Sequence, residues 1–241
     1  MSEFTEKLRE ALTSSSLPFD EAALTYFEVY KNLLLDWNSH INLTAVRDED
    51  GIIYKHFVDS LMVFKVVDNF SSFLDVGSGA GFPGVPVKIV KRDLKLSLIE
   101  SQKKKATFLQ ILLERLAFTD ANVYNARAED LAKDTLRESF DVVSEREFGK
   151  IPINLEIGLP FVKVGGHLLL YKGAKDLDKL DIFKIFIEEL GGSVDRVFPY
   201  KLNDSIERYI ISIKKEWYTP KRYPRSYSSM LRDLKKWGEF A

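Results

Sequence analysis

The stretch FLDVGSGAGFPGVPVKIV, residues 73–90, passes from an apolar segment through closely spaced glycines into a second apolar segment. Its first four residues have the composition of a short buried strand, and a helix is expected to begin near Phe82, because proline suits the first turn of a helix. Glycine permits a tight bend at Gly77, a close approach to a ligand at Gly79, and close packing of helix and strand at Gly81. The stretch therefore predicts a ligand-binding strand–turn–helix unit.

The spacing of the glycines separates several kinds of ligand. A dinucleotide fingerprint, G-x-G-x-x-G, would need a glycine where Phe82 stands, and a P-loop would need G-K-[S/T], which this segment lacks. The pattern G-x-G-x-G after Asp75 indicates S-adenosylmethionine instead, a ligand without phosphate whose amino-acid and ribose parts the turn must accommodate. A glycine-rich turn that holds no ligand is the alternative that the motif alone leaves open.

Side chains that follow the next predicted strands extend this candidate cofactor site. Glu100 ends the second strand, 19 residues after Gly81, where a carboxylate can accept hydrogen bonds from both ribose hydroxyls. Ala128 and Glu129 follow the third strand, where class I methyltransferases usually contact adenine. Arg146 follows the fourth strand, where the methyl acceptor approaches, and could hold a phosphate, a carboxylate or a guanine edge. The candidate cofactor residues are Asp75, Gly77, Gly79, Phe82, Glu100, Ala128, Glu129 and Arg146.

The remaining sequence predicts strands and helices that alternate after a helical start. Helices are predicted at 3–12, 20–38, 49–69, 83–91, 102–116, 128–137, 150–163 and 176–190. Strands are predicted at 73–76, 95–99, 121–125, 140–144, 166–172, 192–202 and 207–215. Alternation implies a mostly parallel sheet, and the short turn between the last two strands favours an antiparallel hairpin at its edge. We expect a Rossmann-like α/β class I methyltransferase fold with seven strands: a helical extension (1–70), the main domain (71–215) and a basic aromatic, partly helical tail (216–241).

Composition narrows the functional classes. The chain has 241 residues, 45% of them hydrophobic and 29% charged, which are ordinary values for a globular protein. It has no cysteine, and therefore no disulfide, thiolate metal site or cysteine nucleophile. No apolar run approaches the ~20 residues that span a bilayer, and the charged N-terminus is unlike a signal peptide. We expect a cytoplasmic location, no membrane and no metal.

Charge is distributed unevenly along the chain. The net charge is −1, yet residues 214–236 hold eight Lys/Arg and two acidic residues, a local net of +6. A basic segment interleaved with Trp217, Tyr218 and Tyr223 suits RNA, which is bound through phosphates and stacked bases. The alternative interpretation of the tail is a solvated extension. The alternative for lysines 103–105 is a solvated helix face. The candidate RNA contacts are Lys103, Lys104, Lys105, Lys214, Lys215, Lys221, Arg222 and Arg225.

Several methylation chemistries can be separated by which residues they need. Methylation of pyrimidine C5 generally uses a cysteine adduct, which this chain cannot form. Methylation of an exocyclic amine commonly uses an [N/D]-P-P-[Y/F] loop, which differs from the SEREFG segment here. Guanine N7 has a lone pair and no proton, so alignment and electrostatics suffice. O-methylation stays open, with Lys172 or His56 as a base.

The motifs together resemble one family. WNSHINLTAV, YKHFVDSL, LDVGSGAGFPGVPVKI, IESQKKKATFL, NARAEDL, DVVSEREF and TPKRYPR occur in this order between Trp37 and Arg225. They are similar to the RsmG family (glucose-inhibited division protein B), bacterial 16S rRNA guanine-N7 methyltransferases. The resemblance implies methyl transfer from S-adenosylmethionine to N7 of one guanosine in 16S rRNA of the small subunit, by an enzyme expected to be a monomer.

The resemblance also assigns residues, with some departures. It supports the cofactor contacts at Gly77, Phe82, Ala128, Glu129 and Arg146, and places H-x-x-D-S and NLT near the reaction. The matching residues are His56, Asp59, Ser60, Asn42 and Thr44, of which His56 and Asp59, with Arg146, are candidates for positioning the reactants; no catalytic residue is assigned. Glu145 and Glu147 depart from the small residues common beside this arginine: they could orient its guanidinium or form a solvated pair. The extension after Arg225 matches nothing in the family, and its helical spacing of Tyr227, Met230, Leu231 and Leu234 predicts an amphipathic helix.

Two other functions remain compatible with the residues. One is a methyltransferase that acts on a small molecule or a protein, which the basic aromatic tail argues against. The other is a non-catalytic, ribosome-associated RNA-binding factor, which the intact glycine turn and Glu100 argue against.

Overall fold

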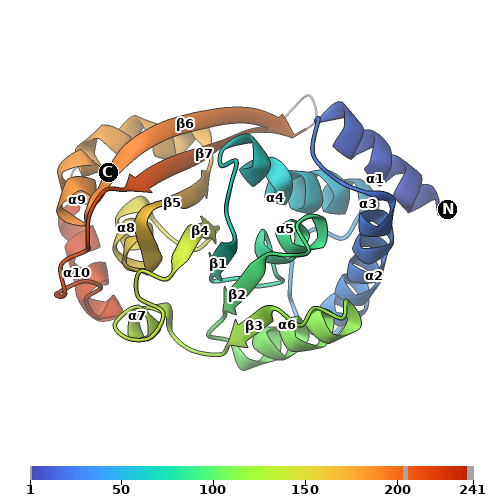
Figure 1. Ribbon diagram of the computed structural model, residues 1–241, viewed down its shortest axis with the longest axis horizontal. Helices are drawn as coiled ribbons and strands as arrows, with labels where there is room; N and C mark the ends of the chain where they lie inside the picture. The colour runs from blue at the N-terminus through green and yellow to red at the C-terminus, as the bar shows by residue number, and fades with distance from the viewer. Residues whose placement is uncertain (1, 203–205, 238–241) are drawn as a thin grey trace.

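The computed structural model describes residues 2–202 and 206–237 and shows a seven-stranded sheet between two layers of helices (Figure 1). The strand order is β3-β2-β1-β4-β5-β7-β6, parallel from β3 to β5, with β7 antiparallel to both β5 and β6. The expected fold class and the C-terminal hairpin are therefore confirmed. The strands are β1 (Ser72–Val76), β2 (Lys95–Ile99), β3 (Ala121–Tyr124), β4 (Phe140–Arg146), β5 (Val162–Lys172), β6 (Gly192–Leu202) and β7 (Ile206–Lys215).

Helices begin where the sequence places capping side chains. The carboxylates of Asp20 and Asp48 accept hydrogen bonds from the N–H groups of Ala23 and Gly51, so each side chain caps the first turn of a helix. The α-helices are α1 (Glu3–Ser14), α2 (Glu21–Asn38), α3 (Glu49–Gly51), α4 (Asp59–Leu61), α5 (Gly84–Val90), α6 (Lys103–Arg115), α7 (Ala128–Leu131), α8 (Ile151–Gly158), α9 (Lys184–Glu189) and α10 (Tyr227–Trp237). The other helical segments are the π-helix η1 (Ile52–Val58) and the 3₁₀ segments η2 (Met62–Lys65), η3 (Leu159–Phe161) and η4 (Ala174–Phe183).

Some predicted boundaries were wrong. The helix expected at 49–69 is a chain of short pieces built around the π-helix η1, and it ends at Lys65. The helix expected at 128–137 ends at Leu131, and the one at 150–163 gives way to η3 at Leu159, next to Pro160. The helix expected at 176–190 is a 3₁₀ segment followed by the short α9. Apolar spacing finds a buried face, but it does not fix which hydrogen-bond ring closes each turn.

The core has two halves, one on each face of the sheet. Figure 1 shows α1, α2, α5 and α6 on one side and α8, α9 and α10 on the other. Phe27 and Phe57, from the predicted N-terminal extension, are fully buried in the same cluster as Phe73 of β1. Burial of one such ring stabilises the fold by about 1.5–3 kcal/mol. Among the described residues, no helix is long and apolar enough to cross a membrane.

The segment after β7 folds back along the second face. Arg137 donates hydrogen bonds to the carbonyl oxygens of Thr219 (2.6 Å) and Tyr223 (2.9 Å), and both of these residues are buried. The segment ends in α10, so the expected helix is present. Met230 is buried in the second core half, and Leu231 is exposed. The part of the predicted tail beyond residue 237 lies outside the described residues.

Candidate active site

The glycine turn bends as the sequence requires. Gly77, Gly79 and Gly81 all have positive φ, at +70°, +57° and +99°. A Cβ added at Gly81 would lie 2.9 Å from Val85 of α5, so this glycine allows the close packing that was expected of it. At Gly79 the nearest such atom is 3.9 Å away, so the backbone there borders open space. The turn is thus tight on one side and open on the other.

Two buried carboxylates hold the turn from beneath. Glu100 accepts hydrogen bonds from the N–H groups of Gly79 (3.0 Å) and Gln102 (2.7 Å), and Asp75 accepts one from the N–H of Gly84 (3.1 Å). Burial raises the pKa of Asp75 to about 7. The structure therefore gives Asp75 a supporting position rather than a ligand contact. The predicted contact between Glu100 and a ribose remains a prediction; one of its oxygens binds the turn and the other binds the backbone of Gln102.

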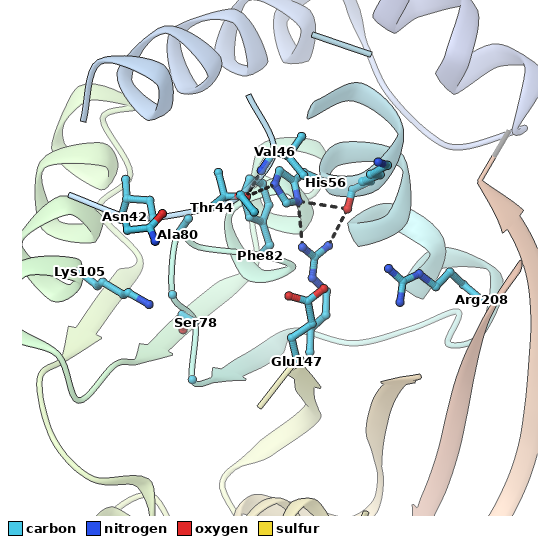
Figure 2. A pocket seen from close by; sticks show the side chains of 16 residues that line it. Asn42, Thr44, Val46, His56, Ser78, Ala80, Phe82, Lys105, Glu147 and Arg208 are labelled. Atoms are coloured by element: carbon cyan, nitrogen blue, oxygen red, sulfur yellow. Dashed lines mark hydrogen bonds between the residues drawn. The ribbon is translucent and has the colours of Figure 1, made fainter. Parts of the chain in front are cut away.

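Two adjoining cavities meet at the turn. The larger has a volume of about 410 Å³ and lies at the edge of the sheet where β1 and β4 end (Figure 2). Its lining includes Asn42, Thr44, Lys55, His56, Gly77, Gly79, Phe82, Lys105, Arg146, Glu147 and Arg208. The smaller, about 200 Å³, is lined by Gly77, Ile99, Ser101, Ala126, Arg127, Ala128, Glu129, Phe148 and Tyr227. Gly77 lines both, so the predicted cofactor residues that reach a cavity border two neighbouring cavities.

An aromatic stack forms one wall of the larger cavity. The ring of Phe82 lies parallel to the imidazole of His56, with centroids 4.3 Å apart, and to the ring of Tyr30 on its other side, at 5.2 Å. The guanidinium of Arg146 lies 5.4 Å from the centroid of Phe82. The bulky residue that excluded a dinucleotide fingerprint therefore joins the glycine turn to the H-x-x-D-S motif.

Arg146, at the end of β4, is fixed by that motif. Its guanidinium donates hydrogen bonds to a carboxylate oxygen of Asp59 (2.7 Å), to Nδ1 of His56 (2.9 Å) and to the carbonyl oxygen of Lys55 (3.1 Å). Both side chains of the ion pair are less than 10% exposed. Tyr200 of β6 donates to the other oxygen of Asp59 at 2.6 Å. The structure therefore brings together the three predicted positioning residues and adds Tyr200.

Burial and hydrogen bonds set the protonation state of His56, which lies in the π-helix η1. Nδ1 of His56 lies 2.9 Å from the guanidinium of Arg146 and 3.1 Å from the carbonyl oxygen of Lys55. Arginine only donates, so we assign Nδ1 as the acceptor from Arg146, and Nε2 as the donor to the hydroxyl oxygen of Thr44 at 2.8 Å. Burial, and then the charge of Arg146, lower the pKa of His56 to about 3. His56 is consequently a neutral ring with both nitrogens occupied.

This protonation state predicts a pH effect on stability. An unfolded histidine has a pKa of about 6.5. Between that pH and the folded value of about 3, the unfolded chain binds a proton that the folded chain does not. The contribution of neutral His56 to the free energy of unfolding is therefore complete above pH ~6.5. It falls by up to about 1.4 kcal/mol per pH unit as the pH decreases. Urea unfolding at about pH 4.5, 5.5 and 7 should give a shallower profile for His56→Gln than for the wild type. The control is His40→Gln, which replaces an exposed histidine. Parallel profiles for all three proteins would contradict the neutral state assigned to His56.

The NLT segment is positioned by a residue that the sequence reasoning missed. Asn38, at the end of α2, accepts hydrogen bonds from the N–H groups of Leu43 (2.8 Å) and Thr44 (3.0 Å) and donates to the carbonyl oxygen of Thr44 (2.9 Å). These bonds close a loop that places Asn42 and Thr44 in the cavity lining. An amide just before N-L-T was a visible signal, because asparagine often bonds nearby backbone.

The two glutamates beside Arg146 have different environments, one buried and one exposed. Glu145 is buried and accepts a hydrogen bond from the amide of Asn154, so it faces away from the cavity. Glu147 lines the cavity and is exposed. The expectation that both orient the guanidinium, or form one solvated pair, was therefore wrong. Lys172, proposed as a possible base, donates to Asn154 (2.8 Å) and to the carbonyl oxygen of Gly149 (2.6 Å) on that same buried side.

The predicted RNA contacts do not form one surface. Lys105 lines the cavity, beside the exposed Lys103 and Lys104 on α6. Lys214 and Lys215 end β7, whereas Arg208, near its start, lines the cavity. Lys214 follows Arg208 by six positions along the strand, about 20 Å.

Several cations of the tail form ion pairs with carboxylates from other parts of the chain. The Lys215 side chain is 0% exposed, donates to the carbonyl oxygen of Leu159 (2.8 Å) and lies 3.6 Å from a carboxylate oxygen of Glu138. Its proposed contact with RNA is therefore corrected to a structural one. Arg225 donates to Glu156 at 2.7 Å, and the exposed Arg222 pairs with Glu189 at the same distance. Lys221 is exposed, and its RNA contact remains a prediction.

Comparison with solved structures defines the class of protein. M. jannaschii TYW2 in complex with AdoMet has a TM-score of 0.56 and 15% identity, covering 73% of this chain and 80% of that chain. A SAM-dependent methyltransferase from Aquifex aeolicus has a TM-score of 0.51 and 17% identity, covering 69% and 93%. At these identities the likeness concerns the fold alone, and the fold is that of S-adenosylmethionine-dependent methyltransferases.

Comparison of sequences defines the family. The family model GidB, rRNA small subunit methyltransferase G, matches residues 23–203. The ribosomal RNA small subunit methyltransferase G of Acetivibrio thermocellus is 40% identical over 232 residues, 93% of this chain and 96% of that protein. That of Caldanaerobacter subterraneus subsp. tengcongensis is 38% identical over 224 residues, 91% and 93%. The chain belongs to the rRNA small subunit methyltransferase G family, which confirms the resemblance, the methyltransferase activity and the expected cofactor.

Proposed function

We propose that this protein transfers a methyl group from S-adenosylmethionine to N7 of one guanosine in the 16S ribosomal RNA of the small subunit. One observation carries the proposal: the cavity at the glycine turn also gathers cationic side chains from distant parts of the chain. They are Lys55, Lys105, Arg146 and Arg208. A cofactor subsite and an anion-binding subsite thus share one opening, as methylation of a polyanion requires.

The two cavities fit the cofactor. Their volumes, about 410 and 200 Å³, together fall within the range of small-molecule sites. Gly79 borders the larger one without a side chain, so backbone can approach a ligand there. When bound, S-adenosylmethionine supplies a methyl group made electrophilic by its sulfonium sulfur. Gly77, Gly79 and Phe82 would hold the amino-acid end, and Ala128 and Glu129 the adenosine end.

Arg146 holds a fixed charge where the two subsites meet. Its bonds to Asp59, His56 and the backbone of Lys55 use three of the five N–H groups of an arginine. Within the described part of the chain, the other two remain for a ligand in the cavity. Because Asp59 and His56 fix its plane, Arg146 can orient what it binds without further ordering.

The RNA would enter from the cationic side. In Figure 2, Lys105 and Arg208 lie on opposite sides of the cavity, with His56 and Glu147 between them. Phosphates on either side of a nucleotide could contact these two side chains, and phosphate contacts position RNA without reading its sequence. Arg208 was missed in the sequence because it stands alone in a strand, outside the basic clusters.

The protonation states support N7 as the acceptor atom. Methylation of N7 removes no proton, so the site needs alignment rather than a general base. His56 is neutral with both nitrogens bonded, and Asp59 is paired with Arg146. Of the described residues that line the cavity, Glu147 is the one carboxylate. O-methylation through Lys172 is disfavoured, because that amine is held on the far side of β4.

The test is to map methylated guanosines in ribosomal RNA. Reduction of RNA followed by aniline treatment cleaves the chain at N7-methylguanosine. Deleting the gene should remove one such cleavage in 16S rRNA, and restoring the wild-type gene should return it. Purified protein should also methylate small subunits from the deletion strain at that position. An unchanged cleavage pattern, or labelled methyl found only on metabolites or proteins, would overturn the proposal.

A further inference from the structure

The C-terminal helix α10 reaches the smaller cavity. Tyr227, its first residue, lines that cavity with Ala128 and Glu129, the residues proposed to hold adenosine. The sequence linked the basic aromatic segment up to Arg225 with RNA, and it predicted an amphipathic helix for the extension that follows. The structure instead places it against the candidate cofactor site.

The position of Tyr227 is enforced by its neighbours on both sides. Two residues earlier, the backbone N–H and Nε of Arg225 donate to one oxygen of the buried carboxylate of Glu156, at 2.8 and 2.9 Å, and Nη2 donates to the other at 2.7 Å. Arg225 also pairs with Asp233, one and a half turns into α10. Three residues after Tyr227, Met230 is 3% exposed. A helix fixed at both its first and second turns holds its first side chain in a defined place.

The chemistry of the smaller cavity suits a flat heterocycle. Ile99, Ala126 and Ala128 supply apolar surface, and Ser101 and Glu129 supply polar groups. Phe148 and Tyr227 add two aromatic rings from distant parts of the chain. A purine gains affinity from aromatic neighbours, and a carboxylate can accept a hydrogen bond from an exocyclic amine.

We propose that Tyr227 is a binding residue for the adenine ring of S-adenosylmethionine, so that the extension after Arg225 completes the cofactor site. This inference rests on the proposed function, because it needs the smaller cavity to take the adenosine half. It makes the order of α10 and the occupancy of the cofactor site interdependent.

The test is calorimetric binding to the full-length protein. The probes are S-adenosylmethionine and 5′-methylthioadenosine, which retains the adenosine half only. Loss of a base–aromatic contact costs about 1–3 kcal/mol, so Tyr227→Ala should weaken both ligands about 5- to 150-fold. Tyr227→Phe, which keeps the ring, should bind within about twofold of the wild type. The matched control is Tyr218→Ala, because Tyr218 is 74% exposed and belongs to the same tail.

The outcomes separate this inference from the proposed function. Wild-type affinity in Tyr227→Ala, for both ligands, would overturn the inference and leave the proposed function standing, whereas a wild-type protein that binds neither ligand would overturn both. If Tyr227→Ala fails to fold, Tyr227→Leu keeps the apolar volume and should show the same loss of affinity. Weaker binding to small subunits with unchanged cofactor affinity would assign Tyr227 to RNA and overturn the inference.

Discussion

Arg146→Ala is expected to lower the free energy of unfolding by about 3–5 kcal/mol and to abolish methyl transfer. The stability loss follows from what remains: the carboxylate of Asp59 would stay buried without its counter-ion, and breaking a buried pair costs this much. Tyr200 would still donate one hydrogen bond to Asp59, but a neutral donor does not replace a charge. Urea unfolding monitored by circular dichroism measures the stability, and methyl incorporation into small subunits measures the activity.

Two further variants test the cause. Adding Asp59→Asn to Arg146→Ala should recover part of the stability but none of the activity, because an amide needs no counter-ion. The matched control is Arg196→Ala, which breaks the exposed pair with Asp195 and should cost at most about 1 kcal/mol. If Arg146→Ala and Arg196→Ala unfold at the same urea concentration, the buried pair does not stabilise the site as argued.

Local features of the site could be read from the sequence because they depend on neighbouring residues. The glycine turn needs positive φ at fixed spacing, and the N-caps Asp20 and Asp48 act within three residues. The order of strands and helices follows from a similarly local alternation of apolar patterns. The π-helix η1 could not be predicted, since its apolar residues fit an ordinary helical period, yet it places His56 against Arg146.

The predicted RNA contact at Lys215 was wrong because the carboxylate beside it is remote in sequence. The cations of the tail lie within about 20 residues of one another, so their sum stands out, whereas most of their partners come from other elements. Glu138, Glu156 and Glu189 precede the tail by tens of residues and reach it only in the folded chain. Composition counts charge but not pairing, so it could not separate the cations of the tail that form ion pairs within the fold from those that do not. The cations that do reach the cavity, such as Arg208, stand singly.

Gly79→Ala is expected to weaken S-adenosylmethionine binding at least tenfold, a loss of about 1.4 kcal/mol or more. At φ +57° the nearest neighbour of the added Cβ would be the carbonyl oxygen of Gly77, 3.9 Å away, so the methyl group would project into the space beside the turn. The variant also places a side chain in the left-handed region, which costs about 1–2 kcal/mol of stability. Calorimetry measures the affinity, and thermal unfolding without ligand measures the strain.

Gly165→Ala separates these two effects. Gly165 in β5 also has positive φ, at +89°, and a Cβ there meets nothing within 4 Å, but it borders a different cavity, away from the glycine turn. Both variants should therefore lose stability, and only Gly79→Ala should lose affinity for the cofactor. Equal affinities in the two variants would show that the open side of the turn is not where the ligand approaches. Gly79 would then be needed for the positive φ of the turn alone, and the cofactor contact assigned to it would be lost.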